Sequence, residues 1–291
     1  MKPIVVGTRG SELAVRQAES MVQYLIDQGL EVTWKRFTTS GDAWLAGPLD
    51  KQVGTGFFTK ELEDSLEARE ADLLIHSFKD VALERPAGVI QACVPLRENP
   101  EDWLVMRPDA PSHPVIGTSS ERRRRFLEKA LPHASFTWIR GNVPTRLQRV
   151  RDGLLRDEPL HGTVLAAAGL ERLGLDLSGL EVRPLRADEL LPAPAQGALL
   201  AETREDRRDI VEALKGFHDA ATARCARLER LVLAGIGGGC QQPLGAHALL
   251  LPNGDVRLRA AFAGEDGLRW AEAEGEDEIQ VVKEVVKGLG W

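Results

Sequence analysis

Short apolar runs alternate with amphipathic stretches of helical spacing through most of the chain. This alternation predicts strands joined by helices, the pattern of an α/β fold. The strands predicted for a first α/β unit are 2–7, 31–37, 72–75 and 198–201. The strands predicted for a second unit are 103–106, 115–117, 136–139 and 163–168. We expect the strand at 198–201 to return to the first sheet.

The pattern changes near residue 219. A helix over 219–234 leads into a glycine-rich loop, and three alternating strands follow, separated by Asn253-Gly254 and Asp266-Gly267 turns. Such dipeptides between alternating runs are typical of β-hairpins. With a closing helix over 278–287, this part predicts a small α+β domain with a three-stranded antiparallel sheet. The predicted domains are 1–97 plus 193–214, 101–191 and 218–291.

Polar residues, many of them arginine, directly follow the predicted strands. The segment His76-Ser77-Phe78-Lys79-Asp80 comes after the strand at 72–75. Ligands of open α/β sheets bind outside the carboxyl ends of strands, so this segment is a candidate site. Arginines stand at or just past strand ends in both units: Arg9, Arg122 or Arg123, Arg140, Arg146 and Arg172. Their convergence predicts a polyanion site between the two units.

Four consecutive arginines, 122–125, open a helix that Thr118-Ser119-Ser120 is predicted to cap. Consecutive helical residues point about 100° apart, so at most two of these side chains can face one site. The alternative for the run is a solvated helix face, and we expect that for the other two.

Residues 38–57 are rich in Gly, Thr and Asp and show little periodicity. Long loops of this kind are usually lids or binding loops. We therefore expect this segment to take part in binding a ligand.

The distribution of charge narrows the class of ligand. The net charge is −7, yet residues 116–172 carry ten Arg and one Lys against six acids, which gives +5 there and leaves −12 elsewhere. Arginine outnumbers lysine 28 to 9. The guanidinium fork suits carboxylates and phosphates of small ligands. The acidic total and an aromatic content of 5% argue against nucleic-acid binding.

The three cysteines differ in their surroundings. Cys240 stands in the run 235–243, where four glycines leave room for a bulky group to approach the backbone. A tight turn around an incidentally buried thiol is the alternative. Cys93 lies in an apolar run, and Cys225 shares a helical face with Leu228 and Val232, so both are expected in the core. Neither disulfides nor a zinc site are expected from this spacing.

No run approaches the roughly 18 apolar residues that a membrane span needs. The chain passes from Lys2-Pro3 directly into a predicted strand, without a signal-peptide pattern. We therefore expect a cytoplasmic protein that is not embedded in a membrane.

Taken together, these motifs resemble the porphobilinogen deaminase (hydroxymethylbilane synthase) family nearly end to end, in the family's order. The motifs are Arg9, Ser11, His76-Ser77-Phe78-Lys79-Asp80, Gly117-Thr118-Ser119-Ser120, Arg140-Gly141-Asn142-Val143, Ala168-Gly169-Leu170 and Gly239-Cys240-Gln241. The resemblance implies two α/β domains similar to type II periplasmic binding proteins, plus a small C-terminal α+β domain that carries the cysteine.

The resemblance also implies the chemistry. Cys240 would carry a dipyrromethane cofactor through a thioether. Four porphobilinogen molecules would be deaminated and joined head to tail on it, and hydroxymethylbilane would be released by hydrolysis. The family is usually monomeric, and the product would pass to uroporphyrinogen-III synthase.

Residue roles follow position by position from the resemblance. Asp80 matches the catalytic carboxylate. Residues that match cofactor-binding positions are Lys79, Asp80, Thr118, Ser119, Arg122, Arg123 and Gln196. Residues that match substrate-binding positions are Arg9, Ser11, Arg140, Arg146 and Arg172.

Some positions depart from the family pattern. Thr55 stands where relatives often have lysine, which puts a contribution of the lid to binding in doubt. Pro144 and Ala195 each replace a usual glycine, although proline is well suited to a first helical turn. An alternative function is a non-catalytic two-lobed binding protein for a small dicarboxylate or phosphate, which leaves Asp80, Cys240 and the third domain unexplained.

Overall fold

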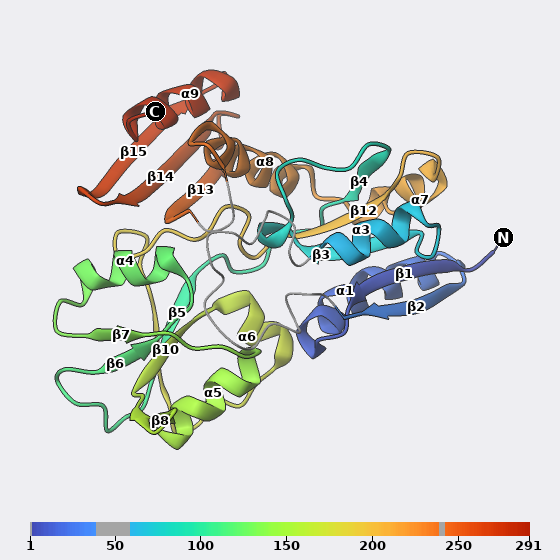
Figure 1. The fold of residues 1–291 in the computed structure, drawn as a ribbon. Coiled ribbons are helices and arrows are strands. Elements are labelled where there is room, and N and C mark those ends of the chain that lie inside the picture. The colour runs from blue at the N-terminus through green and yellow to red at the C-terminus, as the bar shows by residue number, and fades with distance from the viewer. Residues whose placement is uncertain (1, 39–58, 239–241) are drawn as a thin grey trace. The chain divides into compact units, whose positions relative to one another are not determined.

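The computed structural model describes residues 2–38, 59–238 and 242–291. The chain divides into two compact units, and Figure 1 labels their helices and strands. Unit 1 comprises Met1–Glu98 and Gly197–Ala226, and unit 2 comprises Asn99–Gln196 and Arg227–Trp291. The division into three domains stays a prediction.

Unit 1 contains one five-stranded sheet in the order β2-β1-β3-β12-β4. Its strands are β1 (Ile4–Arg9), β2 (Val32–Phe37), β3 (Leu73–Ser77), β4 (Val89–Cys93) and β12 (Leu199–Arg204). β1 pairs in parallel with β2 and β3, and β12 pairs antiparallel with β3 and β4. The expected return of the strand near residue 198 to the first sheet is therefore confirmed.

Helices cover this sheet because their apolar residues recur on one face. In helix α1 (Glu12–Asp27), the buried positions include Ala14, Ala18, Met21 and Leu25, which is helical spacing. Met21 and Leu25 pack into the same core as the buried side of β3. The other helical segments are α3 (Lys60–Glu67), η1 (Phe78–Asp80), α7 (Arg208–Ala213), η2 (Lys215–Phe217) and α8 (Ala220–Gly235). Helix α8 begins in unit 1 and ends in unit 2.

Unit 2 contains a second five-stranded sheet, in the order β11-β5-β10-β6-β7. β10, β6 and β7 are parallel, and β5 is antiparallel to both β10 and β11. The strands are β5 (Asp102–Met106), β6 (Val115–Gly117), β7 (Ser135–Thr137), β10 (Gly162–Ala166) and β11 (Glu181–Pro184), beside a short hairpin of β8 (Leu154–Leu155) and β9 (Glu158–Pro159).

The helices of this part are α4 (Glu121–Ala130), α5 (Val143–Asp152) and α6 (Ala167–Leu173). The predicted strand at 163–168 was wrong at its end, because Ala167 and Ala168 already belong to α6. Pairing of β10 with β5 ends at Ala166 opposite Asp102. Alanine strongly favours helix once a strand partner is lost.

The three-stranded sheet predicted near the C-terminus is present, in the order β13-β14-β15 with antiparallel pairing. Its elements are β13 (Leu244–Leu250), β14 (Val256–Gly264), β15 (Gly267–Gly275) and the closing helix α9 (Glu278–Gly288). Ala261 and Ala263 of β14 share a hydrophobic cluster with Phe126 and Leu127 of α4. Within unit 2, this small sheet and helix α4 are thus parts of one core.

Candidate active site

In unit 1, two candidate side chains lie where β1 ends. β1 and β3 are parallel neighbours, so their carboxyl ends share one edge of the sheet. Arg9 is the last residue of β1, and Ser11 caps α1 by accepting a hydrogen bond from the Ala14 amide at 3.3 Å. A serine hydroxyl that accepts one bond keeps its own proton to donate. Capping is therefore compatible with the predicted contact between Ser11 and substrate.

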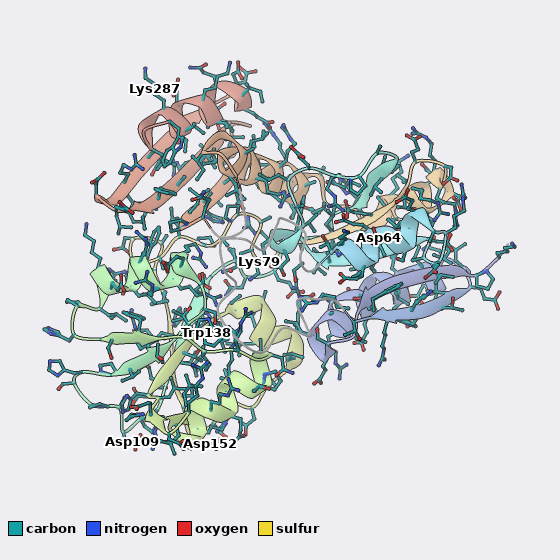
Figure 2. The ribbon with its side chains drawn as sticks, in the orientation of Figure 1. Asp64, Lys79, Asp109, Trp138, Asp152 and Lys287 are labelled. Carbon is teal, nitrogen blue, oxygen red and sulfur yellow. The ribbon has the colours of Figure 1, made fainter. Side chains whose placement is uncertain are left out.

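Lys79 and Asp80 follow β3 in the short helix η1, and both are half-buried (Figure 2 labels Lys79). Phe78 fixes this turn, because its ring is buried and its amide donates to the carbonyl of Ala198 at 3.0 Å. The turn thus holds Lys79 and Asp80 at the edge of the sheet where ligands are expected.

One contact behind this edge was not foreseen. Gln17 of α1 is 7% exposed and lies with its amide 3.0 and 3.1 Å from the hydroxyl of Ser77, the last residue of β3. The sequence signal for this contact was a polar residue, Gln17, on the apolar face of a predicted helix. The pair fixes α1 against the strand that leads to Asp80.

In unit 2, Thr118 and Ser119 form the loop between β6 and α4. Thr118 is buried, its amide donates to the carbonyl of Thr137 at 2.8 Å, and its hydroxyl accepts from the Ser120 amide at 3.2 Å. Ser119 is exposed, and its hydroxyl donates to the carbonyl of Ile139. Of these two predicted cofactor-binding residues, Ser119 is the more accessible.

Three arginines gather around the start of α5. Arg146 donates through Nε to the carbonyl of Gly141 at 2.8 Å, and Arg149 donates through Nη1 to the carbonyl of Arg140. Gly141 has φ +108°, and a Cβ there would lie 2.8 Å from the side chain of Thr145. Glycine is thus needed for the turn that brings these arginines together.

The electrostatics of this group are unfavourable without an anion. Burial, together with the positive charges of Arg123, Arg140 and Arg149, lowers the pKa of Arg146 to about 10. Burial also lowers the pKa of Arg140. Arg146 remains charged at neutral pH, so an arriving carboxylate would relieve the repulsion.

Trp138 precedes this group of arginines along the chain. The guanidinium carbons of Arg140 and Arg156 lie 5.5 and 4.7 Å from the centroid of its ring, and Figure 2 labels Trp138 itself. Both distances are in the range of a cation–π interaction. The indole therefore helps to hold Arg140.

The four arginines of α4 separate as the helical geometry predicts. Arg122 and Arg123 are 4% and 8% exposed, and both form ion pairs with the buried carboxylate of Asp102. The side chains of Arg124 and Arg125 are 38% and 31% exposed. Asp102 was not foreseen as a site residue. The sequence signal for a role of Asp102 was its place as an acid at the start of an otherwise apolar strand.

Gln196 is also buried, and its side-chain amide donates to the carbonyl of Pro100 at 2.8 Å. The preceding residue, Ala195, has φ +61°, a backbone conformation that favours glycine. The amides of Ala195 and Ala248 donate to the fully buried carboxylate of Glu229 at 2.6 and 2.9 Å. This carboxylate holds the strained segment next to Gln196.

Arg172 lies in the last turn of α6, more than one helical turn past the end of β10, and is half-buried. Its position is therefore less close to a strand end than the sequence suggested. Its role in binding stays a prediction.

The cysteine prediction is confirmed for two of the three residues. Cys93 and Cys225 are buried, and burial raises the pKa of Cys93 to about 12. A thiol with that pKa is almost wholly protonated at neutral pH and is a poor nucleophile. Cys240 and the predicted lid with Thr55 lie outside the described residues.

Two absences hold for the residues that the structure describes. They contain no group of His, Cys, Asp and Glu side chains arranged to bind a metal ion. None of the helices among them combines the length and the apolar character needed to cross a bilayer.

Comparison with known proteins gives family-model matches over most of the chain. Residues 4–212 match the model described as porphobilinogen deaminase, dipyromethane cofactor binding domain. Residues 223–290 match the model described as porphobilinogen deaminase, C-terminal domain.

Curated relatives agree with these models. Porphobilinogen deaminase of Macrococcus caseolyticus is 38% identical, with 99% of this chain and 95% of the relative covered. Porphobilinogen deaminase of Nitratidesulfovibrio vulgaris is 40% identical, with 92% of this chain and 86% of the relative covered. The similarity thus spans nearly the whole length of both proteins.

Among solved structures, a periplasmic substrate-binding protein of an ABC transporter from Coxiella burnetii matches with a TM-score of 0.42 and 12% identity. The match covers 76% of this chain and 94% of that one.

Proposed function

The chain belongs to the porphobilinogen deaminase family, and on that premise we propose that it deaminates four porphobilinogen molecules and joins them head to tail. The growing chain would be held on a dipyrromethane cofactor attached to Cys240, and hydroxymethylbilane would be released. A non-catalytic binding protein is not favoured, because the curated relatives are deaminases by name over nearly the whole chain.

The cluster of Arg123, Arg140, Arg146 and Arg149 is the observation that carries this proposal. Their mutual repulsion and burial lower the pKa of Arg146 to about 10. Each pyrrole unit of substrate or cofactor brings an acetate and a propionate. Hydrogen bonds to charged groups contribute about 1.5–3 kcal/mol each, so a polycarboxylate fits this set of donors well. A neutral ligand would leave the repulsion in place.

The state of the cysteines supports attachment at Cys240. Cys93 and Cys225 are buried, and a thioether at either would require the core to open. When bound, the dipyrromethane would supply the pyrrole end to which the first substrate unit is joined. By the family resemblance, the residues that would hold it are Lys79, Asp80, Thr118, Ser119, Arg122, Arg123 and Gln196.

Asp80 would act on the substrate directly. Its carboxylate would hydrogen-bond to the departing amine and exchange a proton with it. Its negative charge would stabilise the positive carbon that remains on the substrate. The position of Asp80 in the turn that Phe78 anchors supports this role. Substrate carboxylates would be held by residues that include Arg9, Ser11, Arg140, Arg146 and Arg172.

The remaining parts of the proposal concern organisation. The two mixed sheets would form two domains of the type II periplasmic-binding-protein kind, with the three-stranded sheet in a third domain that carries Cys240. The protein would act as a monomer in the cytoplasm and pass its product to uroporphyrinogen-III synthase.

Intact mass spectrometry combined with a turnover assay tests the proposal. Protein purified from cells that make porphobilinogen should be heavier than its sequence by two linked pyrrole units, all on the peptide containing Cys240. Cys240→Ala should remove both the added mass and turnover, whereas Cys225→Ala should retain the added mass. An unmodified wild-type protein that does not consume porphobilinogen would refute the proposed function.

A further inference from the structure

Asp102 lies at the edge of the unit 2 sheet where the predicted site residues follow the strands. It is the first residue of β5, and it pairs across the sheet with Ala166, the last residue of β10. Because β5 runs antiparallel to β10, its amino end lies at the edge where β10, β6 and β7 end. The side chain of Asp102 is completely buried.

The carboxylate of Asp102 holds two neighbouring guanidiniums. Its Oδ2 lies 2.7 Å from Nη2 of Arg122, and its Oδ1 lies 2.6 Å from Nη2 and 3.0 Å from Nε of Arg123. Arg122 also donates to the carbonyl of Leu191, and Arg123 donates to that of Val164 at 2.9 Å. Arginine has five N–H donors, so these bonds leave both side chains with donors for a ligand.

The charges in this group do not cancel. One carboxylate faces two guanidiniums, and Arg123 adds to the repulsion that Arg146 experiences. Without the carboxylate, two adjacent buried cations would lack a counter-charge, which strongly favours rearrangement. Asp102 thus restrains both side chains while their net charge stays positive.

We propose that Asp102 is a positioning residue for the ligand site of unit 2, which fixes Arg122 and Arg123 so that they receive carboxylates of the pyrrole units. This inference rests on the proposed function, because it takes the ligand of these arginines from it. Asp102 itself does not touch the ligand in this role. It acts through the two arginines.

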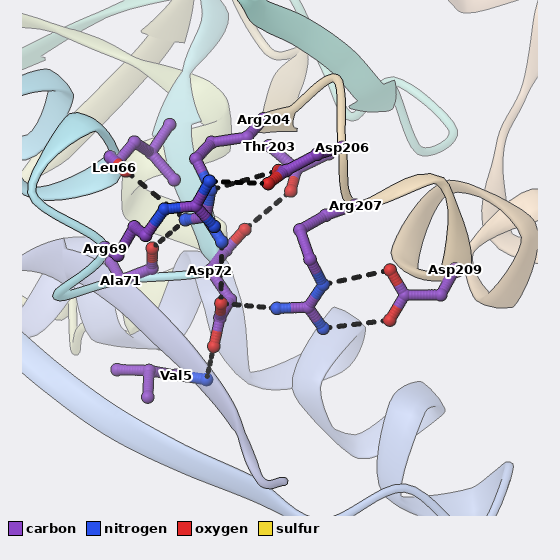
Figure 3. A network of polar contacts seen from close by, with 10 residues as sticks. All are labelled: Val5, Leu66, Arg69, Ala71, Asp72, Thr203, Arg204, Asp206, Arg207 and Asp209. Carbon is purple, nitrogen blue, oxygen red and sulfur yellow. Dashed lines mark hydrogen bonds and ion pairs between the residues drawn. The ribbon is translucent and has the colours of Figure 1, made fainter. Parts of the chain in front are cut away.

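Unit 1 offers a matched control. Asp72 immediately precedes β3 and accepts hydrogen bonds from Arg204 at 3.2 Å, from Arg207, and from the Val5 amide at 3.0 Å (Figure 3). It also bridges two arginines, but it stands at the amino end of its strand, away from the edge where Lys79 and Asp80 lie. A purely structural carboxylate of this kind should affect stability alone.

The experiment compares Asp102→Asn with Asp72→Asn. For each variant we would measure the urea midpoint, the rate at which apo-protein gains dipyrromethane from porphobilinogen by intact mass, and kcat and KM of the loaded protein. We expect both variants to be less stable. Only Asp102→Asn should load more slowly and show a KM raised about 10- to 100-fold, by analogy with metal sites, where changing a residue that orients a metal ligand has an effect of this size.

Asp102→Glu provides the rescue. It keeps the charge and displaces it by one methylene, so its KM and loading rate should lie between those of wild type and Asp102→Asn. If Asp102→Asn does not fold, this variant decides the matter: a raised KM supports the proposal, and a wild-type KM overturns it. Equal KM and loading rates in Asp102→Asn and Asp72→Asn would also overturn it.

A binding measurement separates this proposal from the proposed function. If wild type neither gains mass nor consumes porphobilinogen, the proposed function fails, and the role of Asp102 is decided with butane-1,2,3,4-tetracarboxylate as the probe. Calorimetric titration of Cys240→Ala protein should then show weaker binding after Asp102→Asn and unchanged binding after Asp72→Asn. Unchanged binding in both would overturn the positioning role.

Discussion

The sheets of the two units share one plan of strands, but their edges carry different side chains. In each sheet, three parallel strands are followed by an antiparallel strand, β12 or β5, and by an outer strand, β4 or β11. Past the carboxyl ends of its parallel strands, unit 1 carries an acid, Asp80, beside Lys79. Unit 2 carries Arg140, Arg146 and Arg149 in the corresponding region.

The difference shows how one backbone plan serves two kinds of chemistry. A fold fixes where side chains can gather, and the residues that occupy those positions decide what they do. In unit 1, the polar groups behind the edge are largely paired, as Gln17 is with Ser77. In unit 2, buried cations repel one another. On the proposed function, the acid that performs the deamination lies at the first edge, and carboxylates are held mainly by the arginines of the second edge, with Arg9 and Ser11 contributing from the first.

Removing the acid from the unit 1 edge should have the largest effect. Asp80→Asn keeps size and hydrogen bonding but loses both the proton-handling group and the negative charge. General acid–base help is worth about 10²- to 10⁴-fold, and loss of preorganised charge adds to that. We therefore expect turnover at least about a thousandfold slower from a folded variant, with Asp80→Glu retaining more. Turnover must be measured on protein whose cofactor content is verified by mass, and near wild-type turnover would assign the deamination to another group.

Changing the shape of a cation at the unit 2 edge should have an intermediate effect. Arg146→Lys keeps the charge but loses the planar fork that binds a carboxylate through two bonds. We expect kcat/KM to fall about tenfold or more. Arg151→Lys is the control on the same helix, because the half-buried Arg151 donates to the carbonyls of Asp176 and Ser178 instead. Equal losses in both variants would show that the fork of Arg146 has no special role.

A third test concerns a buried acid of unit 1. The carboxylate of Glu202 lies 2.5 Å from Nη2 of Arg85 and 3.4 Å from Nε2 of His76. Burial alone would raise the pKa of Glu202, but the hydrogen bonds and charges of His76 and Arg85 outweigh burial and lower the pKa. The stabilisation is therefore present above the unfolded value of about 4.3 and is lost as pH falls through the lower folded value.

We expect the urea midpoint of wild type to fall as pH is lowered from about 6 to about 3, and Glu202→Gln to be less stable at pH 6 but less sensitive to acid. Glu205→Gln, at an exposed position, serves as the control and should leave the pH profile unchanged. A Glu202→Gln profile parallel to that of wild type would mean that other groups cause the acid sensitivity.

The smallest effects are expected on the outer face of α4. Arg124 pairs with Glu121 and Glu128 at the surface, at 2.5 and 2.6 Å. Arg124→Lys should change stability by no more than about 0.5 kcal/mol. Arg125→Lys should cost slightly more, because Arg125 reaches the carbonyls of Ala263 and Gly264 in β14. Urea unfolding measures both, and a loss of turnover in either variant would show that the outer face belongs to the site.

The sequence predicted most of what depends on local pattern. Strands β5 and β6, the Asn253-Gly254 turn and the division of the four arginines on α4 all follow from periodicity and turn chemistry. The place of Arg140 past a strand end followed in the same way.

The sequence could not predict the contacts between segments that are far apart along the chain. Asp102 meets Arg122 and Arg123 only because β5 runs antiparallel to β10. Glu229 binds the amide of Ala195, although the two residues are far apart along the chain. Similarly, β10 ends where its pairing partner β5 begins, so the end of β10 cannot be predicted from Ala167 or Ala168 themselves. Strand direction and order decide the first and the last of these, and the packing of helix α8 decides the second.

Trp138 lies close to two guanidiniums, which has a consequence for its fluorescence. Indole emission responds to nearby charge, and the charges of Arg140 and Arg156 lie 5.5 and 4.7 Å from the centroid of this ring. A carboxylate that neutralises Arg140 would change the field across the indole, and the emission of Trp138 would shift with it. The chain contains six tryptophans, so a Trp138→Phe difference spectrum isolates this one. On the proposed function, the emission of Trp138 would therefore report the binding of a carboxylate to Arg140 without an added label.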